Sequence, residues 1–220
     1  MSWDTVWETI HSRREWGKYP KEELVRFVAR NYYAAPDRRA VRFLDLGCGF
    51  GASTWYLARE GFRVDAIDGA ATAIERLRAR LAAENLEASP ATGDIAALAY
   101  PSESFDCVVD IACLMCNDAP SSRQILERVY AVMKPGGKLF SITATPACTG
   151  FGKGERVDED TYRNVPEGPF AGTGTVRFSS EARIRNLYSR FGELKIDVSE
   201  YSSGGRAYTV SNWVIEGSKT

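Results

Sequence analysis

Short apolar runs alternate with helical stretches from residue 41 onward, and this alternation restricts the fold more than any other feature of the sequence. Four runs have the length of buried strands, and they cover residues 41–46, 64–67, 105–111 and 138–143. Three stretches carry apolar residues at helical spacing, and they cover residues 52–60, 70–84 and 121–133. Such alternation predicts an α/β fold with a doubly wound, mostly parallel sheet and right-handed crossovers.

The chain changes character toward its C-terminus. A Pro-Gly-Gly triplet at 135–137 is expected to separate the last helix of this series from the strand that follows. Ser180 is expected to cap a helix that reaches about residue 190. Residues 193–200 and 208–216 each alternate like strands around a Ser- and Gly-rich turn, so we expect the sheet to end in an antiparallel hairpin.

Charge and cysteine content limit the classes of partner and compartment. Lys and Arg total 28 against 29 for Asp and Glu, and this net charge of −1 argues against a dedicated nucleic-acid or anionic-membrane binder. No apolar stretch approaches the roughly 18 residues of a membrane span, and residues 1–14 lack the apolar core of a secretory signal. Five cysteines, an odd number, fit reduced thiols better than a disulfide framework. We therefore expect a cytoplasmic protein with no nucleic-acid and no membrane partner.

The first predicted strand runs directly into a glycine-rich turn, with the sequence FLDLGCGFG at residues 43–51. Glycines at alternate positions let the backbone turn sharply and approach a ligand at the positive N-terminus of the next helix. The spacing also nearly fits the dinucleotide fingerprint, with Ala52 in place of its third glycine, so the glycines alone do not separate cofactors. Asp45 favours a cationic ligand, such as an amino group or a sulfonium centre, because its carboxylate would oppose a pyrophosphate.

From Val41 to Thr143 the sequence resembles the class I S-adenosylmethionine-dependent methyltransferases, in which an acidic residue precedes alternating glycines. The resemblance implies a Rossmann-like, seven-stranded sheet, S-adenosyl-L-methionine as the methyl donor and S-adenosyl-L-homocysteine as the product. It also places the glycine run against the methionine portion of the cofactor. The residues assigned to this contact are Asp45, Gly47, Cys48, Gly49 and Gly51.

Residues further along the pattern are assigned to the rest of the cofactor. Asp68, followed by Gly69, ends the second strand, where a carboxylate can bind both ribose hydroxyls. By resemblance, Asp94 binds the adenine amino group and Ile95 packs the adenine ring. The remaining contacts that the resemblance implies are Asp110 and Ile111 beside the transferring methyl group, and Trp16 and Tyr19 in an N-terminal element that folds over the cofactor.

Structural interpretations compete with several of these assignments. The glycine run could be only a strand-to-helix turn, and Asp94 could cap a local turn. Trp16 and Tyr19 could simply pack the N-terminal helices against the sheet. Cys113 and Cys116 form a CxxC pair, but without a second pair we interpret them as buried thiols, and we expect no metal. An arsenite-binding methyltransferase is the variant of the same chemistry that would use several cysteines.

The expected parts of the chain follow from these assignments. A length of 220 residues fits one domain, and residues 146–178, with six glycines and three prolines, form a lid or binding loop or are otherwise disordered. We expect a single methyltransferase domain with an N-terminal helical cap (1–40), a cofactor-binding core (41–145), a lid or substrate insertion (146–178) and a C-terminal helix with the hairpin (179–220).

The predicted function is transfer of a methyl group to an O or N atom of a small-molecule acceptor by in-line displacement. No Asn-Pro-Pro-Tyr run, the signature of amide or base N-methylation in relatives, follows the fourth strand. His11 is the sole histidine, and beside Ser12 and Arg13 we expect it at the surface rather than in catalysis. The weak candidates for the acceptor side are His11, Asn117, Asp118, Tyr162 and Tyr208.

Two other classes of function stay open at this point. An NAD-dependent oxidoreductase would use the glycine turn and Asp68, but it would leave Asp45 and Asp94 without a role. A non-catalytic S-adenosylmethionine-binding protein would keep the donor site and lose the acceptor pocket. For the predicted methyltransferase we expect either a monomer or a homodimer.

Overall fold

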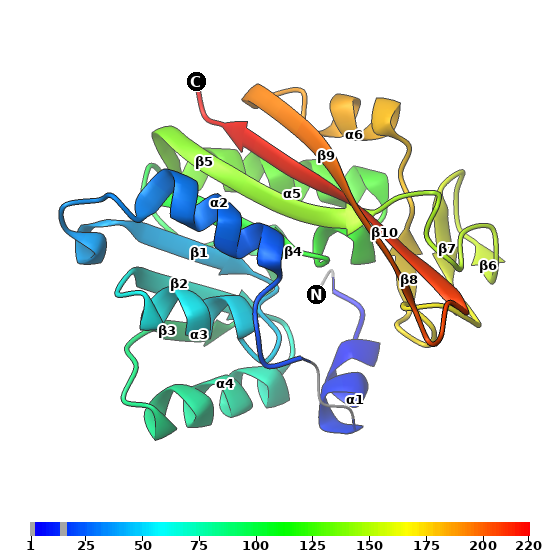
Figure 1. Cartoon of the computed structure of the whole chain (residues 1–220), viewed down its shortest axis with the longest axis horizontal. Helices are drawn as coiled ribbons and strands as arrows, with labels where there is room; N and C mark the ends of the chain where they lie inside the picture. The colour runs from blue at the N-terminus through cyan, green and yellow to red at the C-terminus, as the bar shows by residue number, and fades with distance from the viewer. Residues whose placement is uncertain (1–2, 14–16) are drawn as a thin grey trace.

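The computed structural model describes residues 3–13 and 17–220. A seven-stranded sheet crosses the molecule in the order β3-β2-β1-β4-β5-β10-β9 (Figure 1). The first five of these strands pair in parallel, whereas β10 runs antiparallel to both β5 and β9, which confirms the predicted α/β fold. The strands are β1 (Arg42–Leu46), β2 (Arg63–Asp68), β3 (Ser89–Thr92), β4 (Phe105–Ile111), β5 (Met133–Ala144), β9 (Gly192–Ser203) and β10 (Tyr208–Ser218).

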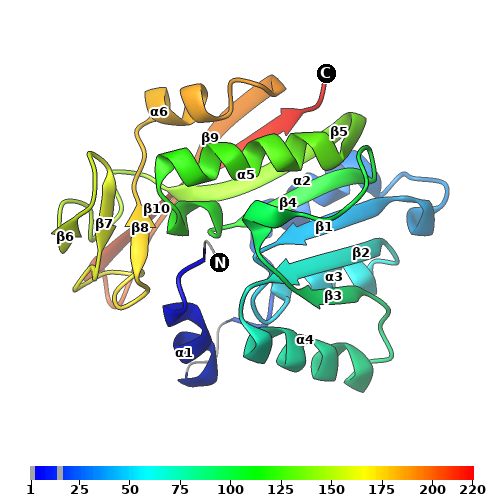
Figure 2. The same cartoon turned by 180° about the vertical axis from the view of Figure 1, so that it is seen from behind.

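Helices cover both faces of the sheet, with α2 and α3 on one face and α5 and α6 on the other (Figures 1 and 2). The N-terminal helix α1 lies apart from these layers, beside α4 (Figure 2). The α-helices are α1 (Val6–Arg13), α2 (Glu22–Tyr32), α3 (Ala52–Arg59), α4 (Ala71–Ala83), α5 (Ala119–Val132) and α6 (Glu181–Leu187). Three short 3-10 helices join them, η1 (Arg38–Ala40), η2 (Ile95–Ala97) and η3 (Leu114–Cys116).

Apolar side chains fill the space between the sheet and its helices. Phe27 of α2 packs against Phe140 of β5 with ring centroids 4.8 Å apart, in a cluster that α3 completes. On the opposite face, Val129 of α5 and Ile184 of α6 are fully buried against strands β1, β4 and β5. Val129 belongs to the 121–133 stretch, whose helical spacing of apolar residues predicts a buried face.

Strand β5 differs from the sequence-based expectation. The Pro-Gly-Gly triplet was expected to form a turn, yet β5 begins at Met133, directly after α5, and runs through it. The Gly136 amide donates to the Lys219 carbonyl at 2.8 Å, and the Lys219 amide donates to the Gly137 carbonyl at 2.9 Å. The C-terminal end of the chain therefore pairs with the backbone of the triplet, a contact between residues about eighty positions apart in the sequence. The triplet itself still interrupts the pairing of β5 with β4: Met133 lies opposite Phe105 and Lys138 opposite Cys107, and Gly136 has a left-handed φ of 74°.

The insertion at 146–178 is folded. It forms a small antiparallel sheet whose strands lie in the order β6-β7-β8. These strands are β6 (Glu155–Arg156), β7 (Thr161–Arg163) and β8 (Thr175–Arg177). Tyr162, Val176 and Phe178 pack with Met115 and Ala144 in an apolar cluster that attaches this sheet to the main body.

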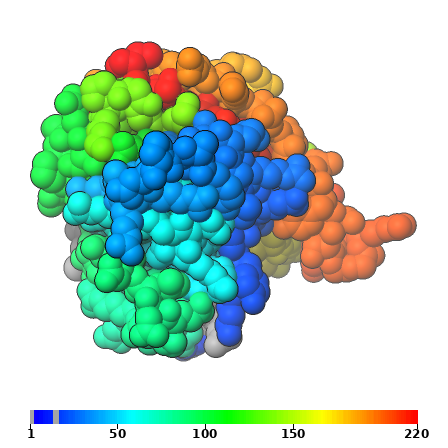
Figure 3. All heavy atoms as spheres, turned by 60° about the vertical axis from the view of Figure 1, so that its left-hand side comes forward, coloured from blue at the N-terminus to red at the C-terminus, as the bar shows by residue number. Residues whose placement is uncertain are grey.

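The C-terminal hairpin brings distant residues to the end of the central sheet. Figure 3 shows the tip of the β9–β10 hairpin standing out from the body of the molecule. Nearer its middle, β10 pairs with β5 so that Asn212 lies opposite Ala144. Among the helices of the described ranges, none is long and apolar enough to cross a lipid bilayer.

Candidate functional site

A cavity of about 530 Å³ lies at the carboxyl ends of β1, β2 and β4. Its walls come from the glycine turn, from α1, from the insertion and from the hairpin, so segments from the whole length of the chain meet here. The carboxyl ends of parallel strands are where open α/β sheets bind their ligands, because the connections diverge there and leave a crevice.

The glycine turn after β1 has the backbone geometry that only glycine adopts easily. Gly47, Gly49 and Gly51 have φ angles of 65°, 50° and 75°, all in the left-handed region. A Cβ atom on Gly47 would lie 2.1 Å from the Cys113 sulfur, and one on Gly51 would lie 2.2 Å from a methyl carbon of Leu77. Gly47 and Gly49 line the cavity, whereas Gly51 begins α3 and its missing side chain makes room for α4.

Asp45 lies at the floor of the cavity and is 2% exposed. The Thr54 hydroxyl of α3 donates to its carboxylate at 2.6 Å. Burial raises the pKa of Asp45 to about 7, against the opposing effect of the Thr54 hydrogen bond. The carboxylate therefore lies where a cationic ligand would be stabilised by its charge.

We expect Asp45→Asn to increase the free energy of unfolding of the ligand-free protein at pH 8, by on the order of 2 kcal/mol. An acid whose pKa is higher in the folded protein than in the unfolded chain destabilises the fold once the pH exceeds its unfolded value, near 3.8. The advantage of the variant should therefore shrink as the pH is lowered toward 4. Urea unfolding at both pH values measures this, and equal stability of variant and wild type at pH 8 would contradict the argument.

Asp68 ends β2 on the opposite side of the glycine turn. One of its carboxylate oxygens accepts the Gly49 amide and the other accepts the Ala70 amide, both at 2.8 Å. These bonds fix the carboxylate at the cavity wall, and each oxygen keeps a lone pair for a ligand. The next residue, Gly69, also lines the cavity, and a Cβ atom there would lie 2.4 Å from the ring of Trp3.

The structure separates the other two predicted acidic contacts from the cavity wall. Asp94 caps η2 by accepting the Ala96 amide at 2.9 Å, and the side chain beside it, Ile95, lines the cavity. Asp110 is fully buried below η3, where it accepts the backbone amides of Cys113 and Leu114 at 3.0 Å and the Ser141 hydroxyl at 2.5 Å. Burial raises the pKa of Asp110 to about 6. Its neighbour Ile111 lines the cavity.

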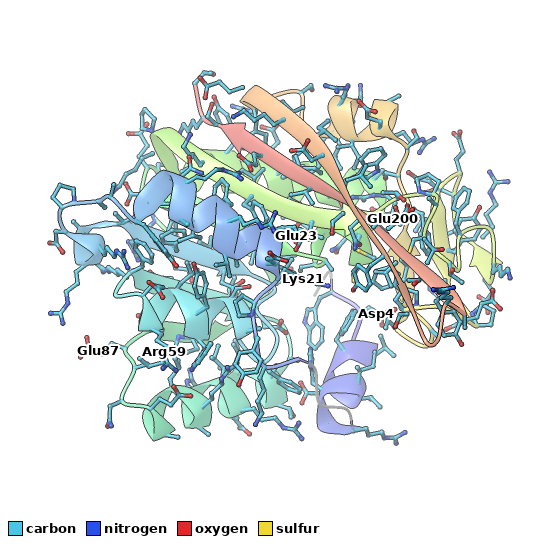
Figure 4. All side chains as sticks on the ribbon, viewed as in Figure 1. Asp4, Lys21, Glu23, Arg59, Glu87 and Glu200 are labelled. Atoms are coloured by element: carbon cyan, nitrogen blue, oxygen red, sulfur yellow. The ribbon has the colours of Figure 1, made fainter. Side chains whose placement is uncertain are left out.

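The N-terminal segment forms one side of the cavity. Tyr19 lies at its edge with its ring edge-on to Trp55, and most of its surface is exposed. Trp16, the other predicted lid contact, lies outside the described residues. Lys21 lines the cavity where α2 begins, and its ammonium donates to the Tyr201 hydroxyl of β9 at 3.4 Å. Figure 4 shows Lys21 beside Glu23, whose carboxylate accepts a hydrogen bond from Ser199 of β9.

His11 does not lie at the surface, contrary to the expectation from its sequence neighbours. It is 5% exposed and lines the cavity, although Ser12 and Arg13 beside it are exposed. The reason is the docking of α1 on α4: Glu8 accepts hydrogen bonds from Thr72 at the start of α4, and Arg76 of α4 donates to the Ser12 carbonyl at 3.4 Å. The Glu8 carboxylate lies at the positive N-terminal end of α4, and the Arg76 guanidinium lies at the negative C-terminal end of α1, so both contacts are favourable for the helix dipoles.

Of the remaining candidates for the acceptor side, Asn117 lines the cavity. Asp118, Tyr162 and Tyr208 do not. Asp118 caps α5 by accepting the Ser121 amide at 2.8 Å. Tyr162 is buried in the apolar cluster of the insertion, and Tyr208 is 39% exposed on the hairpin. The insertion at 146–178, which the sequence predicts as a lid or binding loop, contributes Pro169, Phe170 and Thr173 to the cavity wall. Sequence reasoning missed Tyr201, Val210 and Asn212, because the hairpin reaches the cavity only through long-range pairing.

Three thiols also line the cavity, those of Cys48, Cys113 and Cys116. Burial raises the pKa of each of them, so they are uncharged at neutral pH. Within residues 3–13 and 17–220 no group of three or more His, Cys, Asp or Glu side chains is arranged to hold a metal ion. The thiols therefore form part of an apolar wall.

Known proteins resemble part of this chain. A methyltransferase domain model matches residues 43–137. The ubiquinone biosynthesis O-methyltransferase of Brucella ovis is 29% identical over 150 residues, which is 68% of this chain and 60% of that protein. The malonyl-[acyl-carrier protein] O-methyltransferase of Enterobacter lignolyticus is 30% identical over 158 residues, 71% of this chain and 57% of that protein. The chain thus spans about 60% of the length of the curated relatives it matches.

Solved structures agree with this assignment at the level of the fold. An S-adenosylmethionine-dependent methyltransferase from Methanosarcina mazei has a TM-score of 0.69 at 22% identity, over 81% of this chain and 92% of that one. The matched domain covers the glycine turn, Asp68 and Asp94, and the sheet has the seven strands that the resemblance implied. Residues 43–137 therefore match a methyltransferase domain, and the chain has the fold of the S-adenosylmethionine-dependent methyltransferases.

Proposed function

We propose that this protein transfers the methyl group of S-adenosylmethionine to an oxygen atom of a small-molecule acceptor, with nitrogen as the second candidate atom. The observation that carries the proposal is the division of one cavity into two unlike ends. One end has the glycine turn and the carboxylates of Asp45 and Asp68. The other has mostly apolar and uncharged polar walls from the insertion and the hairpin, and its charged side chains are Lys21, beside Tyr201, and Asp4, beside Gly174. Both named relatives are O-methyltransferases, which supports oxygen.

The residues at the first end fit the cofactor. The left-handed turn at Gly47 and Gly49 leaves backbone free of side chains at the cavity wall, and the Asp68 carboxylate is held where it can accept from the ribose hydroxyls. Asp45 would face the cationic methionine end, and Ile95 would pack the adenine. When bound, S-adenosylmethionine supplies an electrophilic methyl group, so the task of the chain is to orient the acceptor and exclude water.

The second end fits a small acceptor with an apolar body. Ile142, Phe170 and Val210 provide apolar surface, and Asn117 and Asn212 provide amides that can orient a polar substituent. The insertion and the hairpin supply most of this wall, and we propose that they act as the lid that selects the acceptor. Balanced charge on the chain and five free thiols support a cytoplasmic enzyme that acts on neither nucleic acid nor membranes.

Methyl transfer is tested by incubating the protein with S-adenosylmethionine and a panel of phenols, hydroxy acids and amines, and measuring S-adenosylhomocysteine. We expect product formation that depends on an added acceptor and is lost in Asp68→Ala. Tight binding of S-adenosylhomocysteine together with no acceptor-dependent turnover in any class would instead favour a non-catalytic binding protein.

For an acceptor found in this way, we expect Phe170→Ala to raise the acceptor KM about tenfold, the effect of losing roughly 60 Å² of apolar contact. Affinity for S-adenosylhomocysteine should stay unchanged, because Phe170 lies at the acceptor end. Phe151→Ala is the matched control, since Phe151 belongs to the same insertion but packs on Tyr162 and Phe178. Equal effects of both substitutions on KM would contradict the assignment of the acceptor end.

A further inference from the structure

His11 is a buried side chain whose hydrogen-bonding capacity the fold leaves unused. Its Nδ1 atom is buried and has no hydrogen-bond partner anywhere in the described chain. The same ring lines the cavity. Buried polar atoms in folded proteins nearly always have a partner, so an orphaned nitrogen beside a cavity points to a ligand that completes it.

The position of the ring identifies the part of the ligand that it meets. It is wedged between Trp7 and Phe50, with ring centroids 5.7 Å and 4.8 Å away. A Cβ atom built on Gly49 would lie 3.5 Å from the Cε1 atom of the imidazole. Gly49 is also the residue whose amide holds the Asp68 carboxylate, so His11 and Asp68 lie on the same side of the cavity.

We infer that His11 is a cofactor-binding residue whose uncharged imidazole hydrogen-bonds a ribose hydroxyl of S-adenosylmethionine beside Asp68. The inference rests on the proposed function, which places the ribose at Asp68. It makes α1 part of the cofactor site: the helix must dock on α4 for the imidazole to reach the cavity, and bound cofactor in turn stabilises the docked helix.

The charged groups around the ring determine how this contact responds to pH. Burial lowers the pKa of His11 below 6.5, and Arg76 of α4 lowers it further. Asp68 of β2 and Glu8 of α1 oppose this effect without overcoming it. The docked state of α1 favours the uncharged imidazole of His11. The stability that the docked state gains in this way is fully present above pH 6.5, and it is lost as the pH falls below 6.5. Cofactor affinity should follow the same course.

The test is calorimetry with S-adenosylhomocysteine between pH 5.5 and 7.5, on protein without a histidine tag. The wild-type affinity should fall on the order of three- to tenfold from pH 7.5 to pH 5.5. His11→Phe keeps a ring between the two aromatic neighbours and should bind about fivefold more weakly at pH 7.5, with a flatter pH profile. His11→Gln restores a hydrogen bond without a titration, so it should bind more tightly than His11→Phe and show the same flat profile.

Thr9→Ala is the matched control on the exposed face of α1, and it should keep the wild-type affinity and pH profile. Because His11 is the sole histidine, its imidazole proton resonances report its pKa directly, and we expect that pKa to decrease further when the ligand binds. 5′-Methylthioadenosine, which has the ribose but lacks the amino-acid end, should show the same loss in His11→Phe as S-adenosylhomocysteine does.

Three results would overturn the inference: an unchanged affinity in His11→Phe, a pKa of His11 that does not respond to ligand, or a loss confined to S-adenosylhomocysteine. The last result would place the imidazole at the amino-acid end of the ligand. Failure of the proposed cofactor site is recognised separately, because Asp68→Ala would then bind S-adenosylhomocysteine as tightly as the wild type.

Discussion

Replacement of Asp68 by alanine is expected to weaken the binding of S-adenosylhomocysteine by about a hundredfold or more. A carboxylate that accepts both ribose hydroxyls makes two charge-assisted hydrogen bonds, each worth about 1.5–3 kcal/mol. The substitution also removes the acceptors of the Gly49 and Ala70 amides, so the glycine turn loses its anchor. Calorimetry measures the loss, and a melting curve checks that the variant is folded.

Asp65→Asn is the matched control for this prediction. Asp65 lies on the same strand, but its carboxylate pairs with Arg42 at 2.8 Å, away from the cavity. We expect this variant to lose about 1 kcal/mol of stability and to keep its affinity for the ligand. Asp68→Asn preserves the shape of the side chain and should still bind more weakly than the wild type. An affinity unchanged in both Asp68 variants would refute the ribose assignment.

Substitution of Arg177 by methionine is expected to reduce the free energy of unfolding by about 3 kcal/mol. Arg177 is 1% exposed, and it donates to the Asn117 carbonyl at 2.8 Å, to the Ser122 hydroxyl at 2.6 Å and to the Ser179 hydroxyl at 3.2 Å. Its removal leaves buried acceptors without a donor and detaches β8 from the segment that carries Asn117. Urea unfolding measures the loss of stability.

The matched control is Arg185→Met on α6, whose guanidinium forms an exposed ion pair with Glu181. An exposed pair of this kind contributes only about 0.3–0.5 kcal/mol, so the midpoint of unfolding should hardly move. Because Arg177 joins the insertion to the acceptor side of the cavity, its methionine variant should also raise the acceptor KM more than it weakens ligand binding. Equal midpoints for the two variants would show that the buried network contributes nothing to stability.

Periodic patterns predicted the parts of the fold that depend on local spacing. Strand β1, helix α5 and the terminal hairpin could each be predicted from the spacing of apolar residues within the segment itself. The start of β5 at Met133 could not, because the backbone of its Pro-Gly-Gly triplet pairs with Lys219 at the far end of the chain. Local turn chemistry predicted a break there, and the triplet does interrupt the register of β5 on β4, with Gly136 in the left-handed region.

The same distinction applies to the candidate site: a local motif predicts some of its residues, and long-range contacts place the others. Asp45, Gly47, Gly49 and Asp68 lie together because the two strands that carry them are parallel neighbours, which a motif can indicate. The burial of His11 depends instead on contacts of α1 with α4, roughly sixty residues further along, and its flanking residues are exposed. The acceptor wall likewise depends on the register of β10 on β5, which no local pattern specifies.

Titration of the untagged protein with S-adenosylhomocysteine and, separately, with NAD shows which of the two ligands the cavity binds. We expect one site per chain for S-adenosylhomocysteine, with a favourable binding enthalpy, loss of that binding in Asp68→Ala, and no measurable binding of NAD. Tight binding of NAD without binding of S-adenosylhomocysteine would contradict the account, because the glycine turn and Asp68 would then serve a dinucleotide.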